Sequence, residues 1–175
     1  MRPRTDGACI LYVMRSMTVA ALLMAAGACA SDPQKIKEGL WEVRGESTEN
    51  PGGRKITFAY KLCRDHALDR QANAALKSVQ GCRTEIKNQG GGKYASASTC
   101  DVAGTSIVSN GVTTYNNQES THSETQAKYT PPFRGKSDEV MTQDQHYIGA
   151  CPAGVKPGDT IGPDGIVYHH SSLIK

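Results

Sequence analysis

The sequence predicts a mainly β fold, an antiparallel meander of about seven strands curled into a half-barrel or small barrel, with one short helix. Three observations support this fold class. Several windows alternate between apolar and polar residues with the period of two that half-buried strands show. Turn-forming residues separate these windows at intervals of about 10–20 residues. A single window, at about 65–79, has a helical period instead.

The first two strands are expected at residues 40–46 and 56–63. Phe58 and Tyr60 point to one face of the second strand, with polar residues between them. The intervening residues 49–53 read Glu-Asn-Pro-Gly-Gly, which is strong turn chemistry. The two strands are therefore expected to form a hairpin.

A helix is expected next, at about 65–79. Asp65 is a plausible N-cap, and Gly81 ends the segment. Apolar residues recur at helical spacing between these two positions. They are Leu68, Ala72, Ala75, Leu76 and Val79.

The second half of the chain returns to strands, which are rich in Thr, Ser, Gln and Asn. They are expected at residues 83–88, 93–102, 106–115, 121–129 and 139–149. Such polar strands predict a sheet with one solvated face and a thin core. The last segment, residues 152–175, is rich in Pro and Gly, and we expect it to be extended or loosely attached.

The N-terminal segment, residues 1–30, is expected to be an extension followed by a signal peptide. Residues 14–17 carry positive charge, and residues 18–28 carry none. An uncharged run of this length is typical of a signal peptide and is too short to cross a bilayer core of about 30 Å. The small residues before Cys29 match the pattern that a signal peptidase accepts. The segment predicts a periplasmic or envelope-anchored protein.

Cys29 leaves two forms of processing open. In one, the run Ala-Gly-Ala-Cys resembles a bacterial lipobox, and Cys29 becomes the lipidated first residue. In the other, cleavage after Ala28 or Ala30 releases a soluble periplasmic protein. The start of the chain is also open, because the stretch before the positive residues adds nothing to the signal and Met14 competes with Met1.

Removing the N-terminal segment leaves four of the six cysteines. An even number of cysteines in an exported chain predicts two disulfides, for which three connectivities exist. We favour Cys82–Cys100, across a local hairpin, and Cys63–Cys151, between an early strand and the last one. Zinc sites usually contain a closely spaced pair of cysteines, and no such pair is present, so no metal site is expected.

Five residues are candidates for contact with a ligand. His122, Asp144 and His146 lie on strands that are expected to be neighbours, and Asp144 and His146 share one face of their strand. Trp41 and Tyr60 are candidates for lining a groove, although packing in the core is the favoured role for Trp41, the single Trp of the chain. The sequence has no nucleophile, phosphate-loop, dinucleotide or zinc-protease motif, so no catalytic residue and no cofactor are expected.

The opening of the predicted domain resembles a known family. Residues 36–43, Ile-Lys-Glu-Gly-Leu-Trp-Glu-Val, look like the K-x-G-L-W-E opening of the bacterial exported family DUF3617, a domain of unknown function. The four cysteines follow in the order of that family, and the resemblance extends over about 36–160. It implies an exported, β-rich, disulfide-bonded domain at 36–151, often lipoprotein-like, followed by the tail 152–175. It implies no established activity.

The composition narrows the expected function. The net charge of +3 is spread along the chain, which gives no nucleic-acid signature. We expect a non-enzymatic exported β-domain that binds a small ligand or an envelope protein and meets the membrane only through a lipid at Cys29. One alternative is a small periplasmic inhibitor or chaperone-like partner protein. The other is an enzyme with a site at His122, Asp144 and His146.

Overall fold

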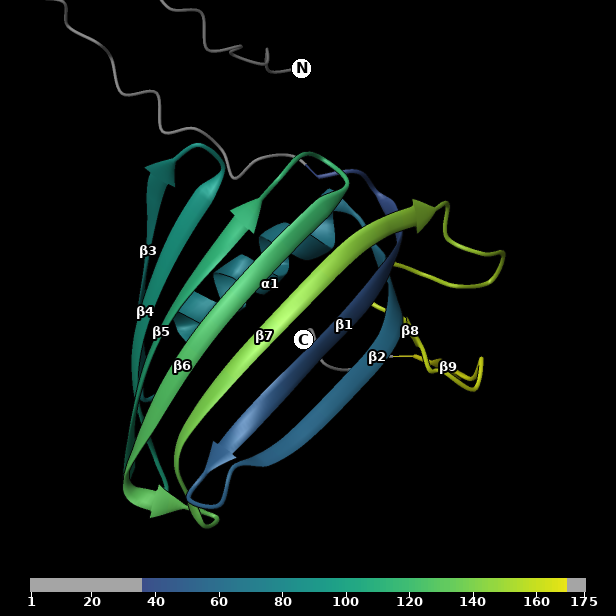
Figure 1. The fold of residues 1–175 in the computed structure, drawn as a ribbon. Coiled ribbons are helices and arrows are strands. Elements are labelled where there is room, and N and C mark those ends of the chain that lie inside the picture. The colour runs from purple at the N-terminus through teal and green to yellow at the C-terminus, as the bar shows by residue number, and fades with distance from the viewer. Residues whose placement is uncertain (1–35, 170–175) are drawn as a thin grey trace, which may run out of the picture. The chain divides into compact units, whose positions relative to one another are not determined.

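A long hairpin, β1–β2, opens the part of the chain that the structure describes, residues 36–169 of a computed structural model. These residues form nine strands and one helix (Figure 1), and the mainly β prediction is confirmed. The elements are β1 (Gly39–Asn50), β2 (Arg54–Arg64), α1 (His66–Ser78), β3 (Cys82–Gly90), β4 (Lys93–Val102), β5 (Thr105–Tyr115), β6 (Ser120–Phe133), β7 (Lys136–Gly149), β8 (Thr160–Ile161) and β9 (Val167–Tyr168). The predicted signal peptide, Cys29 and both candidate start residues lie outside the described range.

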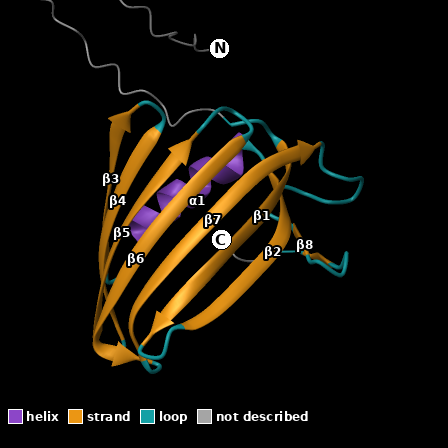
Figure 2. Ribbon diagram, viewed as in Figure 1, coloured by secondary structure: helices purple, strands orange, loops and turns teal. Residues whose placement is uncertain are grey.

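All nine strands belong to one antiparallel sheet, in the order β3-β4-β5-β6-β7-β1-β2-β8-β9. Strands β3 to β7 follow one another as a meander, but β7 then pairs with β1 rather than with a later strand. Trp41 of β1 therefore lies opposite Tyr147 of β7. The sheet curls without closing, so an open half-barrel forms and a closed barrel does not (Figure 2).

The sheet has two chemically different faces. Alternate residues of β1, such as Trp41 and Val43, point to the face we call the inner face, and the intervening residues, such as Glu42 and Arg44, point to the outer face. The helix α1 lies within the curve of the sheet (Figure 2). The inner face is therefore the concave face, part of which α1 covers.

Helix α1 begins and ends within one residue of the predicted segment. The Asp65 carboxylate accepts a hydrogen bond from the Leu68 amide at 2.7 Å, which confirms the expected N-cap. The apolar stripe is less buried than the helical spacing suggested, because Ala72 and Ala75 are exposed. Polar contacts also hold α1 to the sheet, because Asp69 of α1 accepts hydrogen bonds from the Arg64 guanidinium of β2 at 2.7 and 3.1 Å.

The apolar core is small and lies at the start of β1. Trp41 and Val43 are almost completely buried, as is Cys63. The Trp41 indole donates a hydrogen bond to the Lys37 carbonyl at 2.9 Å and packs edge-on against Tyr147. Trp41 therefore takes the packing role that sequence reasoning favoured over a ligand contact.

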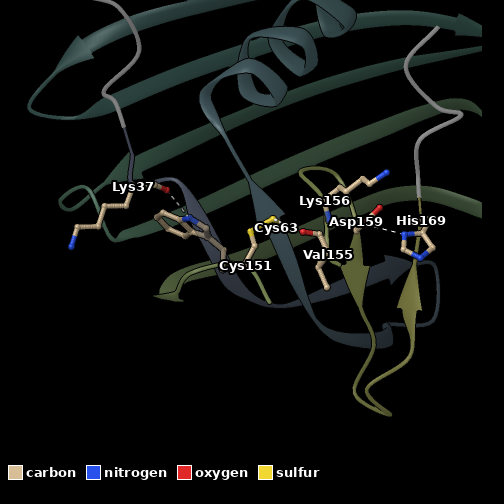
Figure 3. The surroundings of a disulfide bond; sticks show 8 residues. Lys37, Cys63, Cys151, Val155, Lys156, Asp159 and His169 are labelled. Carbon is tan, nitrogen blue, oxygen red and sulfur yellow. Dashed lines mark hydrogen bonds and ion pairs between the residues drawn. A yellow bond between two sulfur atoms is a disulfide. The ribbon is translucent and has the colours of Figure 1, made fainter. Parts of the chain in front are cut away.

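The structure contains two disulfides in the favoured pairing, Cys63–Cys151 and Cys82–Cys100. The first joins the end of β2 to the residues that follow β7 (Figure 3). The second joins the cross-strand neighbours of β3 and β4.

The Pro- and Gly-rich tail packs more closely than expected. The Cys63 amide donates to the Asp159 carbonyl at 3.0 Å, and the Gly158 amide donates to the Cys63 carbonyl at 2.8 Å. The Asp159 carboxylate is buried and accepts hydrogen bonds from the Lys156 amide and from His169 (Figure 3). Residues 160–161 and 167–168 therefore extend the sheet beyond β2, which fits the extended form of the tail rather than the loosely attached one.

Candidate functional site

The predicted polar site lies on the outer face of β6 and β7. His122 and Asp144 are direct cross-strand neighbours, and His122 Nδ1 lies 2.7 Å from Asp144 Oδ1. The other ring nitrogen, Nε2, lies 3.2 Å from Glu124 Oε1. His146 is on the same face, two residues beyond Asp144 and opposite Glu42. The sheet thus brings the predicted residues to one face and adds Glu124, which sequence reasoning had missed.

The chemistry of this cluster is that of a charge-paired surface group. Hydrogen bonds to Asp144 and then Glu124 raise the pKa of His122 above its usual value. Because carboxylates engage both ring nitrogens, neither nitrogen is free to take a proton from a substrate. The side chains of His122 and Asp144 are 38% and 57% exposed, so water screens the pair. Within residues 36–169, no group of three or more His, Cys, Asp or Glu side chains is arranged to hold a metal ion.

Tyr60 lines an apolar groove of about 310 Å³ at the β2 edge of the sheet. Leu62 of β2 pairs with Thr160 of β8, and Thr160 pairs with Tyr168 of β9. Since directly paired residues point to the same face, Leu62, Thr160 and Tyr168 form one continuous surface across three strands. Gly162 completes the lining.

A glycine and the exposure of one tyrosine make the surface of this groove accessible. A side chain at Gly162 would begin 3.2 Å from the Tyr168 ring, so glycine leaves room for the ring. The Tyr168 side chain is itself accessible, because the residue is 48% exposed. Tyr60 is half-buried, and this burial raises the pKa of its hydroxyl group. The groove therefore has one half-buried aromatic wall, Tyr60, and one exposed aromatic wall, Tyr168.

The residues from the tail were missed at the sequence level. Tyr60 and Leu62 belong to the period-two row on β2 that the sequence shows plainly. Tyr168 lies in the segment that we expected to be extended or loosely attached. The sequence signal for this strand would have been Val167–Tyr168, which follows Gly165. Two residues are too few for the alternation of a strand to be recognised.

A second concavity, of about 370 Å³, crosses β3 to β6 on the outer face. Small side chains form its floor, and charged or amide side chains form its walls. Its lining residues include Ala95, Ala97, Glu85, Lys87, Glu124 and Gln126. It is more polar than the groove at Tyr60.

An ionic cluster occupies the inner face at the end of the sheet near the β1–β2 turn. Lys136 donates to Glu139 at 2.8 Å and lies 3.3 Å from Glu49, which also accepts a hydrogen bond from Arg54 at 2.8 Å. The Tyr129 hydroxyl donates to Glu139 at 2.8 Å. Burial opposes the ionisation of Glu139, but the hydrogen bonds from Lys136, a serine and Tyr129 outweigh it and lower the pKa of Glu139 to about 2. The cluster joins β1, β2, β6 and β7.

Among the described residues, no helix is both long enough and apolar enough to span a membrane. No curated protein matches the chain in a sequence comparison. The family model described as "Protein of unknown function (DUF3617)" matches residues 36–151, which is most of the chain and contains both disulfides. The match agrees with the resemblance carried by the Gly-Leu-Trp-Glu motif. The chain therefore belongs to the DUF3617 family, whose function is unknown.

Proposed function

We propose that this protein is an exported β-domain that binds a small amphipathic molecule in the groove lined by Tyr60, Leu62 and Tyr168. The observation that carries the proposal is the apolar lining of this groove, which leaves the Tyr168 ring accessible to solvent. Sites for small molecules are concave and mostly apolar, with a few polar groups, and they begin at about 300 Å³. The groove, at about 310 Å³, lies at the lower end of this range, and its lining is mostly apolar.

The polar atoms of the groove define the type of ligand. Apart from Thr160, the polar side-chain groups of its lining are the hydroxyl groups of Tyr60 and Tyr168, and no charged side chain belongs to the lining. Hydroxyl groups donate and accept hydrogen bonds, so they suit an uncharged polar group on a hydrocarbon or aromatic body. A ligand with an apolar ring or short alkyl chain is therefore favoured over an ion.

The test is a titration of the purified protein with the fluorescent probe N-phenyl-1-naphthylamine. We expect saturable binding, with loss of at least tenfold in affinity for Tyr168→Ala, because burying an aromatic side chain is worth about 1.5–3 kcal/mol. Tyr168→Phe keeps the ring and should retain binding. Val108→Ala, at an exposed position on the outer face of β5, is the matched control and should bind like the wild type.

Two results would contradict the proposal. Binding of the probe that does not saturate would show that there is no defined site. Equal affinity of Tyr168→Ala and the wild type would place the site elsewhere. Circular dichroism and the intact Cys63–Cys151 disulfide check that Tyr168→Ala is folded.

Export is part of the same proposal. Disulfides persist in oxidising compartments such as the periplasm, and the structure has two of them. The uncharged segment at residues 18–28 is the proposed signal. Fractionation of cells that express the full chain tests this point, and recovery of the protein in the cytoplasm would refute it. If Cys29→Ser moves the protein from the membrane to the soluble fraction, Cys29 carries a lipid, and unchanged partitioning excludes the anchor.

A further inference from the structure

Strand β3 ends the sheet on one side. Within the described residues it pairs with β4 alone, and Figure 1 shows it as the outermost strand of the meander. Residues 85–90 are all exposed, as is Arg83, and Thr84 between them is half-buried. Near the middle of the strand lies one large apolar side chain, Ile86, which is 38% exposed. A strand of this length with unpaired backbone groups is a template for another strand.

The backbone hydrogen bonds show which groups of β3 point off the edge. The Asp101 amide of β4 donates to the Gly81 carbonyl at 2.8 Å, whereas the Cys82 amide donates to the Val79 carbonyl and not to β4. In an antiparallel pair, hydrogen-bonded and non-hydrogen-bonded positions alternate. Even-numbered residues of β3 therefore direct their amide and carbonyl groups away from β4. Ile86, near the middle of the strand, is one of them.

The charges on β3 are complementary to themselves. Glu85 and Lys87 flank Ile86 on the outer face, and their side chains are 64% and 69% exposed. A two-fold axis through Ile86 sets a second β3 antiparallel to the first. Glu85 then faces the partner's Lys87, and Lys87 faces the partner's Glu85. Within one strand, Lys87 Nζ lies 3.3 Å from Glu85 Oε1. In the dimer each of these two charges also faces an opposite charge of the other strand.

Other two-fold registers fit less well. An axis through Glu85 sets two carboxylates opposite each other, and an axis through Lys87 sets two ammonium groups opposite each other, which is unfavourable. An axis through Thr84 pairs Arg83 with the partner's Glu85 but leaves residues 87–90, four of the nine residues of β3, unpaired. Only the axis through Ile86 combines full overlap, opposite charges and a hydrogen-bonded central pair.

We propose that this edge binds a second copy of the chain, through antiparallel β3–β3 pairing about a two-fold axis at Ile86. The two sheets then form one continuous sheet, and Ile86 contacts the partner's Ile86 on the inner face. The interface is isologous, since both copies contribute the same residues. It is separate from the groove at Tyr60, which lies at the other edge of the sheet.

Sedimentation velocity of the purified protein over a wide range of concentration tests the pairing. We expect a reversible monomer–dimer equilibrium. Glu85→Lys and Lys87→Glu each replace two opposite-charge contacts by two like-charge contacts, so each should weaken the dimer by about tenfold or more. The double variant Glu85→Lys/Lys87→Glu restores the complementarity and should dimerise like the wild type. Lys128→Glu, on β6, makes the same change of charge away from the edge and should have no effect.

A cross-linking experiment checks the register itself. Central residues of a hydrogen-bonded antiparallel pair are about 5.5 Å apart between Cα atoms, which a disulfide can span. Ile86→Cys should therefore give a covalent dimer on non-reducing electrophoresis, beyond any seen for the wild type. Thr99→Cys, an exposed position one strand further in, should not.

The proposal is overturned if the protein is monomeric at every concentration. It is also overturned if single charge reversals leave the dimer unchanged, which would place the interface elsewhere. Failure of the double variant to regain dimerisation, with a native circular dichroism spectrum, would exclude the register. If Ile86→Cys still dimerises but gives no covalent dimer under oxidising conditions, the two-fold axis at Ile86 is excluded.

Discussion

Glu139→Gln tests the ionic cluster on the inner face. Glu139 accepts hydrogen bonds from Lys136, Tyr129 and Ser47, and Lys136 also lies 3.3 Å from Glu49. Glutamine has nearly the same shape as glutamate, but it has one accepting oxygen where glutamate has two, and Ser47 and Tyr129 donate to different oxygens. The substitution therefore removes the charge that Lys136 faces and the acceptor of one of the two hydroxyl groups.

The size of the effect follows from the pKa of Glu139. The cluster lowers this pKa from 4.5 to about 2. Because a tenfold change in proton affinity is worth about 1.4 kcal/mol, the upper limit of the stabilisation is about 3 kcal/mol. The side chain is 20% exposed and solvent screens part of the interaction. We therefore expect Glu139→Gln to lower the free energy of unfolding by about 1–2 kcal/mol at pH 7.

The sign of the pH dependence is fixed by the same shift. A carboxylate whose pKa is lower in the folded state stabilises the fold above its unfolded pKa, here 4.5. That contribution is lost as the pH falls from 4.5 towards 2. Urea unfolding of both proteins at several pH values measures it. The difference between wild type and Glu139→Gln should be largest at neutral pH and should shrink through this window.

The control is Glu46→Gln on the outer face. The Glu46 side chain is 47% exposed and lies 3.8 Å from Lys55, so its substitution should change the stability by less than about 0.5 kcal/mol. The reasoning is refuted if the two substitutions cost the same. It is equally refuted if the cost of Glu139→Gln stays constant as the pH falls.

Three further predictions concern the disulfides, the core and the outer face. Replacing both cysteines of Cys63–Cys151, whose sequence separation is 88, should lower the free energy of unfolding by about 4–5 kcal/mol. For Cys82–Cys100, with a separation of 18, the loss should be about 3 kcal/mol. Urea unfolding measures both, and equal losses would contradict the loop-entropy argument. Gly45→Ala sets a methyl group against the Phe58 ring and the Thr142 carbonyl oxygen and should destabilise the fold by about 1–3 kcal/mol. In Phe58→Ala the contact with the ring is absent and the contact with the Thr142 carbonyl remains, so the same Gly45→Ala change should cost less, and strictly additive costs would exclude the clash with the ring. Asp144→Asn should lower the pKa of His122 in an NMR titration, and an unchanged pKa would show that their hydrogen bond is absent in solution.

Much of the fold was predictable because its signals are local. The period-two row that includes Phe58 and Tyr60 defines β2, and the Asp65 cap defines the start of α1. The hairpin disulfide Cys82–Cys100 follows from two neighbouring strands and a glycine turn. In each case the interacting residues lie within about twenty positions of one another, so pattern and turn chemistry are sufficient.

The arrangement of the site was less predictable because it depends on distant segments. His122 and Asp144 were expected on neighbouring strands, and β6–β7 pairing does bring them together. The contribution of Tyr168 to the groove depends on the tail docking on β2, which local composition does not show. Trp41 was open between core and groove until the pairing of β1 with β7 buried it.

The sequence by itself determined the β class, the single helix, the family and the set of four cysteines available for two disulfides. The tertiary structure decided which strands are neighbours, which face each side chain occupies and where the sheet stays open. The division has a physical reason. Periodicity and turn chemistry are properties of a few adjacent residues, whereas strand order and register are fixed by the sum of packing contacts between segments far apart in the chain.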